Sequence, residues 1–192
     1  MKKSLITVLS IVGVIGLLLI WMVSTYNKLV TLDEAVTAQW AQVESAYKRR
    51  VDLIPNLVAT VKGYAGHESS TYENVTAARA KATQVTLDLS DISEEKLKEF
   101  QAAQGELSVA LGRLMMIQEN YPELKANQNF LDLQAQLEGT ENRINTERVR
   151  YNNSCRGFNS SIRRFPGMLF GFEKRLYFEI STEDMETPEV QF

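Results

Sequence analysis

An uninterrupted apolar run near the amino terminus constrains this chain more than any other feature. Residues 5–23 read LITVLSIVGVIGLLLIWMV, which is nineteen positions without a charged side chain. At about 1.5 Å of rise per residue, a helix of this length crosses a hydrocarbon core of about 30 Å. The run therefore predicts a membrane-spanning helix. Its anchoring residues include Leu5, Ile11, Leu17, Trp21 and Val23.

A cleaved signal peptide is the alternative to a permanent anchor. Signal peptides have a shorter apolar core, and small residues mark their cleavage site. Here the segment Val23-Ser24-Thr25 matches that pattern poorly, and no cysteine follows directly to support lipoprotein processing. We therefore expect an uncleaved anchor, with Trp21 and Tyr26 at the membrane interface.

The charges beside the run indicate its orientation. Lys2 and Lys3 precede it, whereas only Lys28 follows closely. Positively charged flanks are retained on the cytoplasmic side of a membrane. We therefore expect a single-pass protein with its amino terminus in the cytoplasm and its folded domain outside.

The rest of the chain has the composition of one helical domain. The chain has 192 residues, of which about 165 remain beyond the anchor, enough for a single domain. Good helix formers dominate this part. The net charge of −3 gives no basic field for nucleic acid. Cys155 is the only cysteine, so an intrachain disulfide is impossible, and we expect a buried residue rather than a nucleophile.

Apolar residues recur at spacings of three and four in four successive stretches, the pattern of amphipathic helices. The first stretch continues directly from the anchor. Ser93, followed by two glutamates, predicts the start of the third helix, and Pro122 predicts the start of the fourth. Short connections favour antiparallel neighbours. We therefore predict an all-α protein, in which a transmembrane helix is followed by a long antiparallel up-and-down four-helix bundle.

Two positions disturb this helical pattern. Pro55 lacks an amide hydrogen and predicts a kink or a restart of the helix. Gly66 and the Ser69-Ser70 pair weaken the next stretch, and a capping box from Ser70 to Glu73 would restart a helix there. Because the apolar spacing stays in phase across this stretch, we expect one continuous helix over residues 54–85 with a weak point.

These elements divide the chain into five parts. They are a flank (1–4), an anchor (5–25), a helical bundle (26–165), an aromatic segment (166–178) and an acidic tail (179–192), which its composition predicts to be disordered. We expect the aromatic segment to dock on the bundle; contact with lipid or a partner is the alternative. Its candidate patch residues are Phe170, Phe172, Lys174, Arg175, Tyr177 and Phe178.

Polar residues at helical spacing form a second group of candidates. Glu141 and Arg148 share the phase of apolar Ile144 and are expected to point inward. A buried arginine needs a carboxylate, so we expect a polar network between helices that fixes their register. A partner-binding site is the alternative. The candidates are Arg49, Arg50, Asp52 and Asn56 near Pro55, and Glu141, Arg148 and Asn152 in the fourth stretch.

Four ordered strings resemble the LemA family. They are RRVDLIPNLVATVKGYAGHE (49–68), YPELKAN (121–127), EGTENRI (138–144) and YNNSCRGFNSSIRRFPGMLFGFEKRLYF (151–178). The resemblance implies an antiparallel helical bundle on a membrane anchor in bacteria, without an established activity. Family members have been associated with membrane organisation, including magnetosome formation. Others are encoded beside membrane proteases or TPM-domain proteins, which makes such membrane proteins the partners that the resemblance implies.

No enzymatic motif is found. His67-Glu68 resembles the start of HExxH, but His67 is the only histidine, so that zinc site is ruled out. Nucleophile-elbow, Walker A and dinucleotide-binding patterns do not occur. We therefore expect no catalytic residue, cofactor or metal, and we predict a scaffold or adaptor of the bacterial envelope. A lipid-binding or membrane-shaping bundle and an enzyme with a polar site near Pro55 are the alternatives, and oligomerisation is left open.

Overall fold

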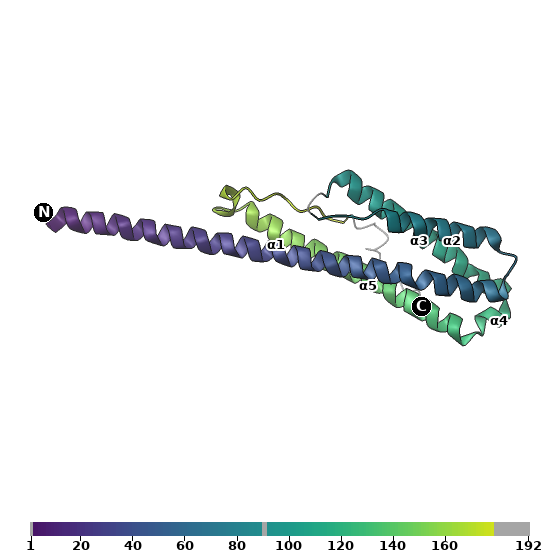
Figure 1. Ribbon diagram of the computed structural model, residues 1–192. Helices are drawn as coiled ribbons and strands as arrows, with labels where there is room; N and C mark the ends of the chain where they lie inside the picture. Colours follow the sequence, from purple (N-terminus) through teal and green to yellow (C-terminus); the bar gives the residue numbers. More distant parts are fainter. Residues whose placement is uncertain (1, 90–91, 179–192) are drawn as a thin grey trace, which may run out of the picture. The chain divides into compact units, whose positions relative to one another are not determined.

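The computed structural model describes residues 2–89 and 92–178, and these ranges fold into helices without a strand (Figure 1). The all-α prediction is confirmed. The predicted disordered tail over residues 179–192 lies outside the described residues. The helices are α1 (Lys2–Tyr64), α2 (Ser69–Gln84), α3 (Glu94–Met116), α4 (Pro122–Lys125) and α5 (Gln128–Ile162), and the 3-10 turns are η1 (Ile117–Asn120) and η2 (Gly167–Leu169).

The chain divides into two compact units. The first unit holds residues up to Gln39 together with Tyr151–Tyr177. The second unit holds Trp40–Arg150 and, of the described carboxyl-terminal residues, Phe178. Helices α1 and α5 contribute residues to both units. The predicted anchor thus belongs to the first unit, and most of the predicted polar candidates belong to the second.

Helix α1 is, within the described ranges, the one helix whose length and apolar composition suit a membrane crossing. A signal sequence near an amino terminus would meet the same criterion. The helix continues from the apolar run into the domain, as the first apolar stretch predicts, and runs on past Pro55 as far as Tyr64. Its apolar stretch is not buried by other parts of the described chain.

Pro55 lies inside α1 without ending it. A proline cannot donate to the carbonyl four residues earlier, which here belongs to Val51. The Arg79 side chain of α2 supplies the missing donor, because its Nε donates to the Val51 oxygen at 3.1 Å. Pro55 itself is exposed, whereas the neighbouring Ile54 is buried. The helix tolerates proline here because its ring faces solvent and the carbonyl left without its helical partner has a donor from a neighbouring helix.

The prediction of one continuous helix over residues 54–85 is wrong. Helix α1 ends at Tyr64 and α2 begins at Ser69, with Glu68 rather than Ser70 at the cap position. The Tyr72 hydroxyl donates to the Ala65 carbonyl, and Arg79 reaches Val51, so α2 folds back antiparallel to α1. In-phase apolar spacing suits both arrangements equally. Folding back buries the apolar stripe of α2 against that of α1.

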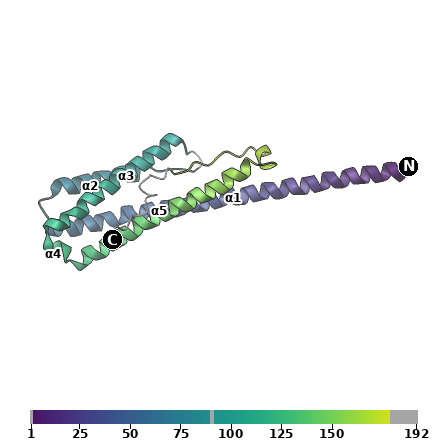
Figure 2. The ribbon, with the colours of Figure 1, turned by 180° about the vertical axis from the view of Figure 1, so that it is seen from behind.

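The second unit is an antiparallel arrangement around one core, to which α1 to α5 all contribute. Helices α2 and α3 lie side by side in both views (Figures 1 and 2) and are linked by Lys81 and Glu106 at 2.6 Å. Helix α5 returns along α1, where Asn127 donates to the Tyr64 hydroxyl at 2.8 Å. The core includes Ile54, Leu57, Val61, Val75, Leu107, Leu111, Leu114, Leu124, Phe130 and Leu137.

Of the two helix starts predicted from local sequence, the start of α3 has the expected cap, whereas Pro122 does not begin a long helix. Ser93 caps α3, since its hydroxyl oxygen accepts from the Lys96 amide at 3.2 Å. Pro122 begins only the one-turn helix α4, so the predicted fourth helix is interrupted. Helix α5 starts afresh at Gln128, because the Asn127 side chain accepts from the Phe130 amide at 3.0 Å.

Candidate functional site

A buried arginine joins three helices of the second unit. Arg50 of α1 is only 2% exposed, although it carries a permanent charge. Its Nη1 lies 3.0 Å from Glu141 Oε1 on α5 and 2.8 Å from Ser108 Oγ on α3. Its Nη2 donates to the side-chain oxygen of Gln104 and, at 3.3 Å, to the Gln104 carbonyl. We call Arg50, Gln104, Ser108 and Glu141 the Arg50 cluster.

The surroundings of Arg50 offset the cost of burying its charge. An isolated buried guanidinium is strongly unfavourable, whereas one paired with a carboxylate and hydrogen-bonded is tolerated. Glu141 supplies the carboxylate and remains 37% exposed at its side chain, so the pair is only partly desolvated. The Tyr47 ring lies 5.2 Å from the guanidinium carbon and adds a cation–π contact. The predicted inter-helix polar network thus has a physical centre at Arg50.

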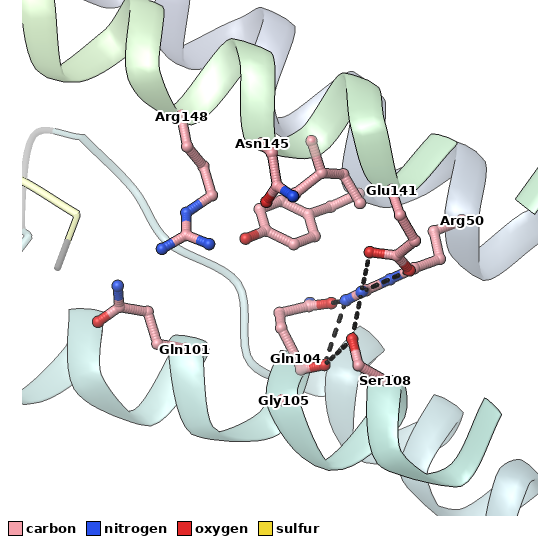
Figure 3. A pocket seen from close by; sticks show the side chains of 10 residues that line it. Arg50, Gln101, Gln104, Gly105, Ser108, Glu141, Asn145 and Arg148 are labelled. Carbon is pink, nitrogen blue, oxygen red and sulfur yellow. Dashed lines mark hydrogen bonds and ion pairs between the residues drawn. The ribbon is translucent and has the colours of Figure 1, made fainter. Parts of the chain in front are cut away.

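A polar pocket of about 410 Å³ adjoins the Arg50 cluster (Figure 3). Arg148 of α5 and Gln101 of α3 point toward one another across it. The Arg148 guanidinium also lies 5.4 Å from the ring of Phe178. The pocket is lined by Tyr47, Arg50, Gln101, Gln104, Gly105, Ser108, Glu141, Ile144, Asn145 and Arg148.

The lining of this polar pocket consists mainly of charged and hydrogen-bonding groups. It offers two guanidinium groups and several amide and hydroxyl groups, but a single carboxylate and no histidine or cysteine. Nucleophilic and acid–base catalysis need a reactive group beside a base or a second titratable group. Among the described residues, no cluster of three or more His, Cys, Asp or Glu side chains is placed to hold a metal. The arrangement can donate and accept hydrogen bonds, and its guanidinium groups can pair with an anionic group.

The structure brings together three of the seven polar candidates. Arg50, Glu141 and Arg148 line the same pocket. The other candidates lie elsewhere: Arg49, Asp52 and Asn56 are exposed on α1, and Asn152 is buried in the first unit. Asp52 and Asn56 share a helix face, as their spacing predicts.

Sequence reasoning missed the contribution of α3 to the Arg50 cluster. Gln104 is 5% exposed and also donates to the Ala82 carbonyl at 3.3 Å. It stands between Phe100 and Leu107 in the apolar phase of α3. A polar residue at such an apolar position is the sequence signal by which Gln104 could have been found. Ser108, which is exposed at the edge of the cluster, has no comparable signal.

A second, more apolar pocket of about 560 Å³ in the second unit shares Tyr47 and Gln104 with the polar pocket. Trp40 and Val51 of α1, Phe100 of α3 and Leu87 from the segment between α2 and α3 supply its apolar lining. Glu44, Lys48, Asp52 and Arg79 supply charge. Asp52, singled out from the sequence, therefore lines this pocket and not the polar one.

Residues 166–177 of the aromatic segment dock on helices of their own unit. The Arg175 backbone exchanges two hydrogen bonds with the Asn159 side chain, at 2.7 and 2.8 Å. The Arg175 guanidinium pairs with Asp33 at 2.8 Å. Phe172 packs edge-on against Phe158, with ring centroids 5.8 Å apart. These contacts agree with docking on helices.

The other predicted patch residues have separate surroundings. Phe170 contacts the Tyr26 ring at 5.4 Å in the first unit, and the Lys174 ammonium lies 5.8 Å from the ring of Tyr177. Phe178 belongs to the second unit, where it is 2% exposed and stacks on Trp40 at 5.6 Å. The six patch residues therefore do not form one continuous exposed surface.

The single thiol, Cys155, is buried and unreactive by its environment. Its sulfur lies 3.6 Å from the Leu176 carbonyl oxygen, and its side chain is fully buried. Burial raises the pKa of the Cys155 thiol to about 11. Burial also raises the pKa of the neighbouring Tyr151 hydroxyl. Both groups stay neutral at physiological pH, so Cys155 is a core residue in this state.

Cys155 is expected to react with a maleimide at pH 8 at least about 100-fold more slowly than an exposed thiol, because two pKa units reduce the thiolate fraction by that factor and burial adds to it. The reference is a Met116→Cys variant, since Met116 is 63% exposed. The measurement is labelling followed by intact-protein mass. Equal labelling of Cys155 and of the introduced cysteine would show that the thiol is accessible.

Known sequences place these features within one family of proteins. The sequence profile of the LemA family matches residues 39–192, which include the Arg50 cluster and the aromatic segment. Magnetosome protein MamQ 2 of Paramagnetospirillum magneticum is 27% identical over 195 residues, covering 91% of this chain and 70% of that protein.

Two further relatives show a similar extent of likeness. Magnetosome protein MamQ of Magnetospirillum gryphiswaldense is 28% identical, covering 90% of this chain and 70% of that protein. Protein LemA of Metamycoplasma hominis is 24% identical, covering 79% of this chain and 65% of that protein.

Proposed function

Because this chain belongs to the LemA family, we propose that it is a membrane-anchored helical scaffold or adaptor of the bacterial envelope. The apolar run at the start of α1 is the main observation that supports this proposal. Its large apolar side chains from Leu5 to Ile20 are each at least 50% exposed. Exposing apolar surface to water costs about 25 cal/mol per Å². A helix segment that is apolar on all sides is therefore expected to lie in an apolar medium. A lipid bilayer is the medium that its length matches.

The second unit supports the role of an adaptor. Two ion pairs link its helices, Arg50 with Glu141 and Lys81 with Glu106. Its polar and apolar pockets offer charged, hydrogen-bonding and apolar groups for recognition. We propose other membrane proteins as the partners, with a membrane protease or a TPM-domain protein as specific candidates. We further propose a cytoplasmic amino terminus, with the folded part outside.

The relatives' names agree with a role at a membrane structure. Two of them are named magnetosome proteins. The name describes those two relatives and not this chain. Transferred as a proposal, it favours organisation of membrane components over catalysis. An enzyme with a polar site near Pro55 is the alternative, and it would have to use the charged residues of the second pocket, among them Asp52 and Arg79.

Extraction with alkaline carbonate tests the anchor. Wild-type protein in native membranes is expected to stay in the pellet with its full intact mass. A Val12→Asp/Val14→Asp variant is expected to move to the soluble fraction, because each charge in a span costs about 2.5–3.5 kcal/mol. The matched control is Val109→Asp/Val149→Asp, which changes two exposed valines of the second unit and is expected to stay membrane-bound. Loss of residues 5–23 from the mature protein would instead favour a signal sequence.

Photo-crosslinking in native membranes tests the adaptor role. A crosslinking side chain at Asp52 or Asn56, both exposed, should capture discrete membrane proteins without disturbing the fold. The control is the same crosslinker at Leu17 within the predicted span, which is expected to capture lipid and span neighbours only. If both exposed positions gave no discrete adducts in native membranes, the adaptor proposal would fail.

A further inference from the structure

A tight turn in the first unit presents three large apolar side chains to the outside. Phe165, Met168 and Leu169 follow the end of α5 and are 65%, 62% and 59% exposed. Arg163 and Arg164 immediately precede them and are exposed as well. An apolar tip beside two cationic side chains is the composition that favours a membrane interface. We call residues 163–169 the interfacial turn.

The backbone holds this turn in one shape. The Met168 amide donates to the Arg164 carbonyl at 3.0 Å, and the Leu169 amide donates to the Pro166 carbonyl at 3.0 Å. Pro166 and Gly167 are buried beneath the tip. Any Cβ on Gly167 would collide with the Ser161 carbonyl oxygen, so the turn packs closely on the end of α5. The three apolar side chains are therefore directed outward by a built structure.

Ring contacts place this turn beside the end of the predicted span. The Phe165 ring lies 5.6 Å from the ring of Trp21, and Phe170 lies 5.4 Å from Tyr26. Further along the aromatic segment, Arg175 pairs with Asp33. Contacts at positions 21, 26 and 33 follow α1 in order, so Phe165 lies level with the last residues of the apolar run. Trp21 is the residue expected at the boundary between headgroups and acyl chains.

From this placement we propose that the interfacial turn inserts Phe165, Met168 and Leu169 into the boundary layer of the bilayer that α1 crosses, with Arg163 and Arg164 against lipid phosphates. The inference rests on the proposed anchor. Lipid is the fitting occupant because Trp21 sets the depth of Phe165 and the flanking charges are cationic. The first unit then contacts the membrane twice, by a span and by a shallow wedge.

Fluorescence from labelled single positions tests the inference in the full chain. Three variants, Met168→Cys, Met116→Cys and Leu17→Cys, carry an NBD label in vesicles of phosphatidylethanolamine and phosphatidylglycerol, with the unsubstituted chain as the blank for Cys155. Met116 matches Met168 in residue type and exposure, at 63% against 62%. Quenchers are lipids with a shallow doxyl group and aqueous iodide. We expect doxyl lipid to quench the labels at 168 and 17, and iodide to quench the label at 116 severalfold more than the label at 168.

The positions separate failure of this inference from failure of the anchor. If the label at 17 is quenched by lipid while that at 168 responds to iodide as 116 does, the anchor stands and the wedge is overturned. If the label at 17 is itself open to iodide, the anchor is overturned as well.

A Gly167→Ala change in the Met168→Cys chain tests the shape of the turn. The added methyl group collides with the Ser161 carbonyl, so iodide protection at 168 should fall. Unchanged protection would contradict a role for this packing.

Discussion

Replacing Glu141 with leucine is expected to lower the free energy of unfolding by about 3 kcal/mol. The change leaves the Arg50 charge buried without its carboxylate, and removing one partner of a buried pair costs about 3–5 kcal/mol. The lower end applies because the Glu141 side chain is 37% exposed, so water already reaches one side of the pair. Urea unfolding of the full chain in detergent micelles, followed by far-ultraviolet circular dichroism, measures the change.

Two further variants make this test specific to the Arg50 cluster. Adding Arg50→Met to Glu141→Leu removes the charge that was left alone and should restore most of the loss. Glu138→Leu changes an exposed glutamate one turn earlier on α5 and should alter stability by less than about 0.5 kcal/mol. Equal losses for Glu138→Leu and Glu141→Leu, or a double variant as unstable as the single one, would show that the pair does not hold these helices together.

Some features of the fold follow directly from local sequence. The phase shared by Glu141, Arg148 and Ile144 predicts that these residues face the same way, and the first two line one pocket. The serine before two glutamates at the start of α3 makes the expected cap. Both are properties of a single helix, so spacing and local hydrogen bonding are enough to predict them.

The end of α1 could not be predicted in this way. Apolar spacing across residues 54–85 is the same whether the helix continues or folds back. The difference comes from contacts distant in sequence, above all Arg79 with the Val51 carbonyl that Pro55 leaves open. Only the neighbouring helix shows why proline is tolerated and the chain turns a few residues later.

The candidate site has the same limit. Sequence reasoning singles out Arg50 and Glu141 but misses Gln104, although Gln104 is a polar residue in an apolar phase. No feature of the local sequence predicts that these three residues contact one another. Their meeting depends on α1, α3 and α5 being neighbours in register, which is a property of the packed unit. The contacts among these residues can therefore be identified only from the structure, even where each residue has a signal in the sequence.

Replacing Trp40 with alanine is expected to lower the free energy of unfolding by about 3–5 kcal/mol, the usual cost of removing a large core aromatic. Trp40 is 4% exposed and lies within 5.6 Å of Phe178 and 6.5 Å of Phe100, measured between ring centroids. The second unit already has a neighbouring pocket of about 560 Å³, which the lost ring would enlarge. Collapse around the gap is therefore limited, and the upper part of the range is favoured.

The chain supplies a matched control in its other tryptophan. Trp21 is 45% exposed at the end of the apolar run, so Trp21→Ala should leave urea unfolding in micelles within about 0.5 kcal/mol of wild type. Phe178→Ala should reproduce part of the Trp40 effect, because it removes the stacked partner from the same site. If Trp40→Ala and Trp21→Ala had equal effects, Trp40 would not belong to a packed core. A large loss for Trp40 and Phe178 together would show that the last described residue closes the second unit.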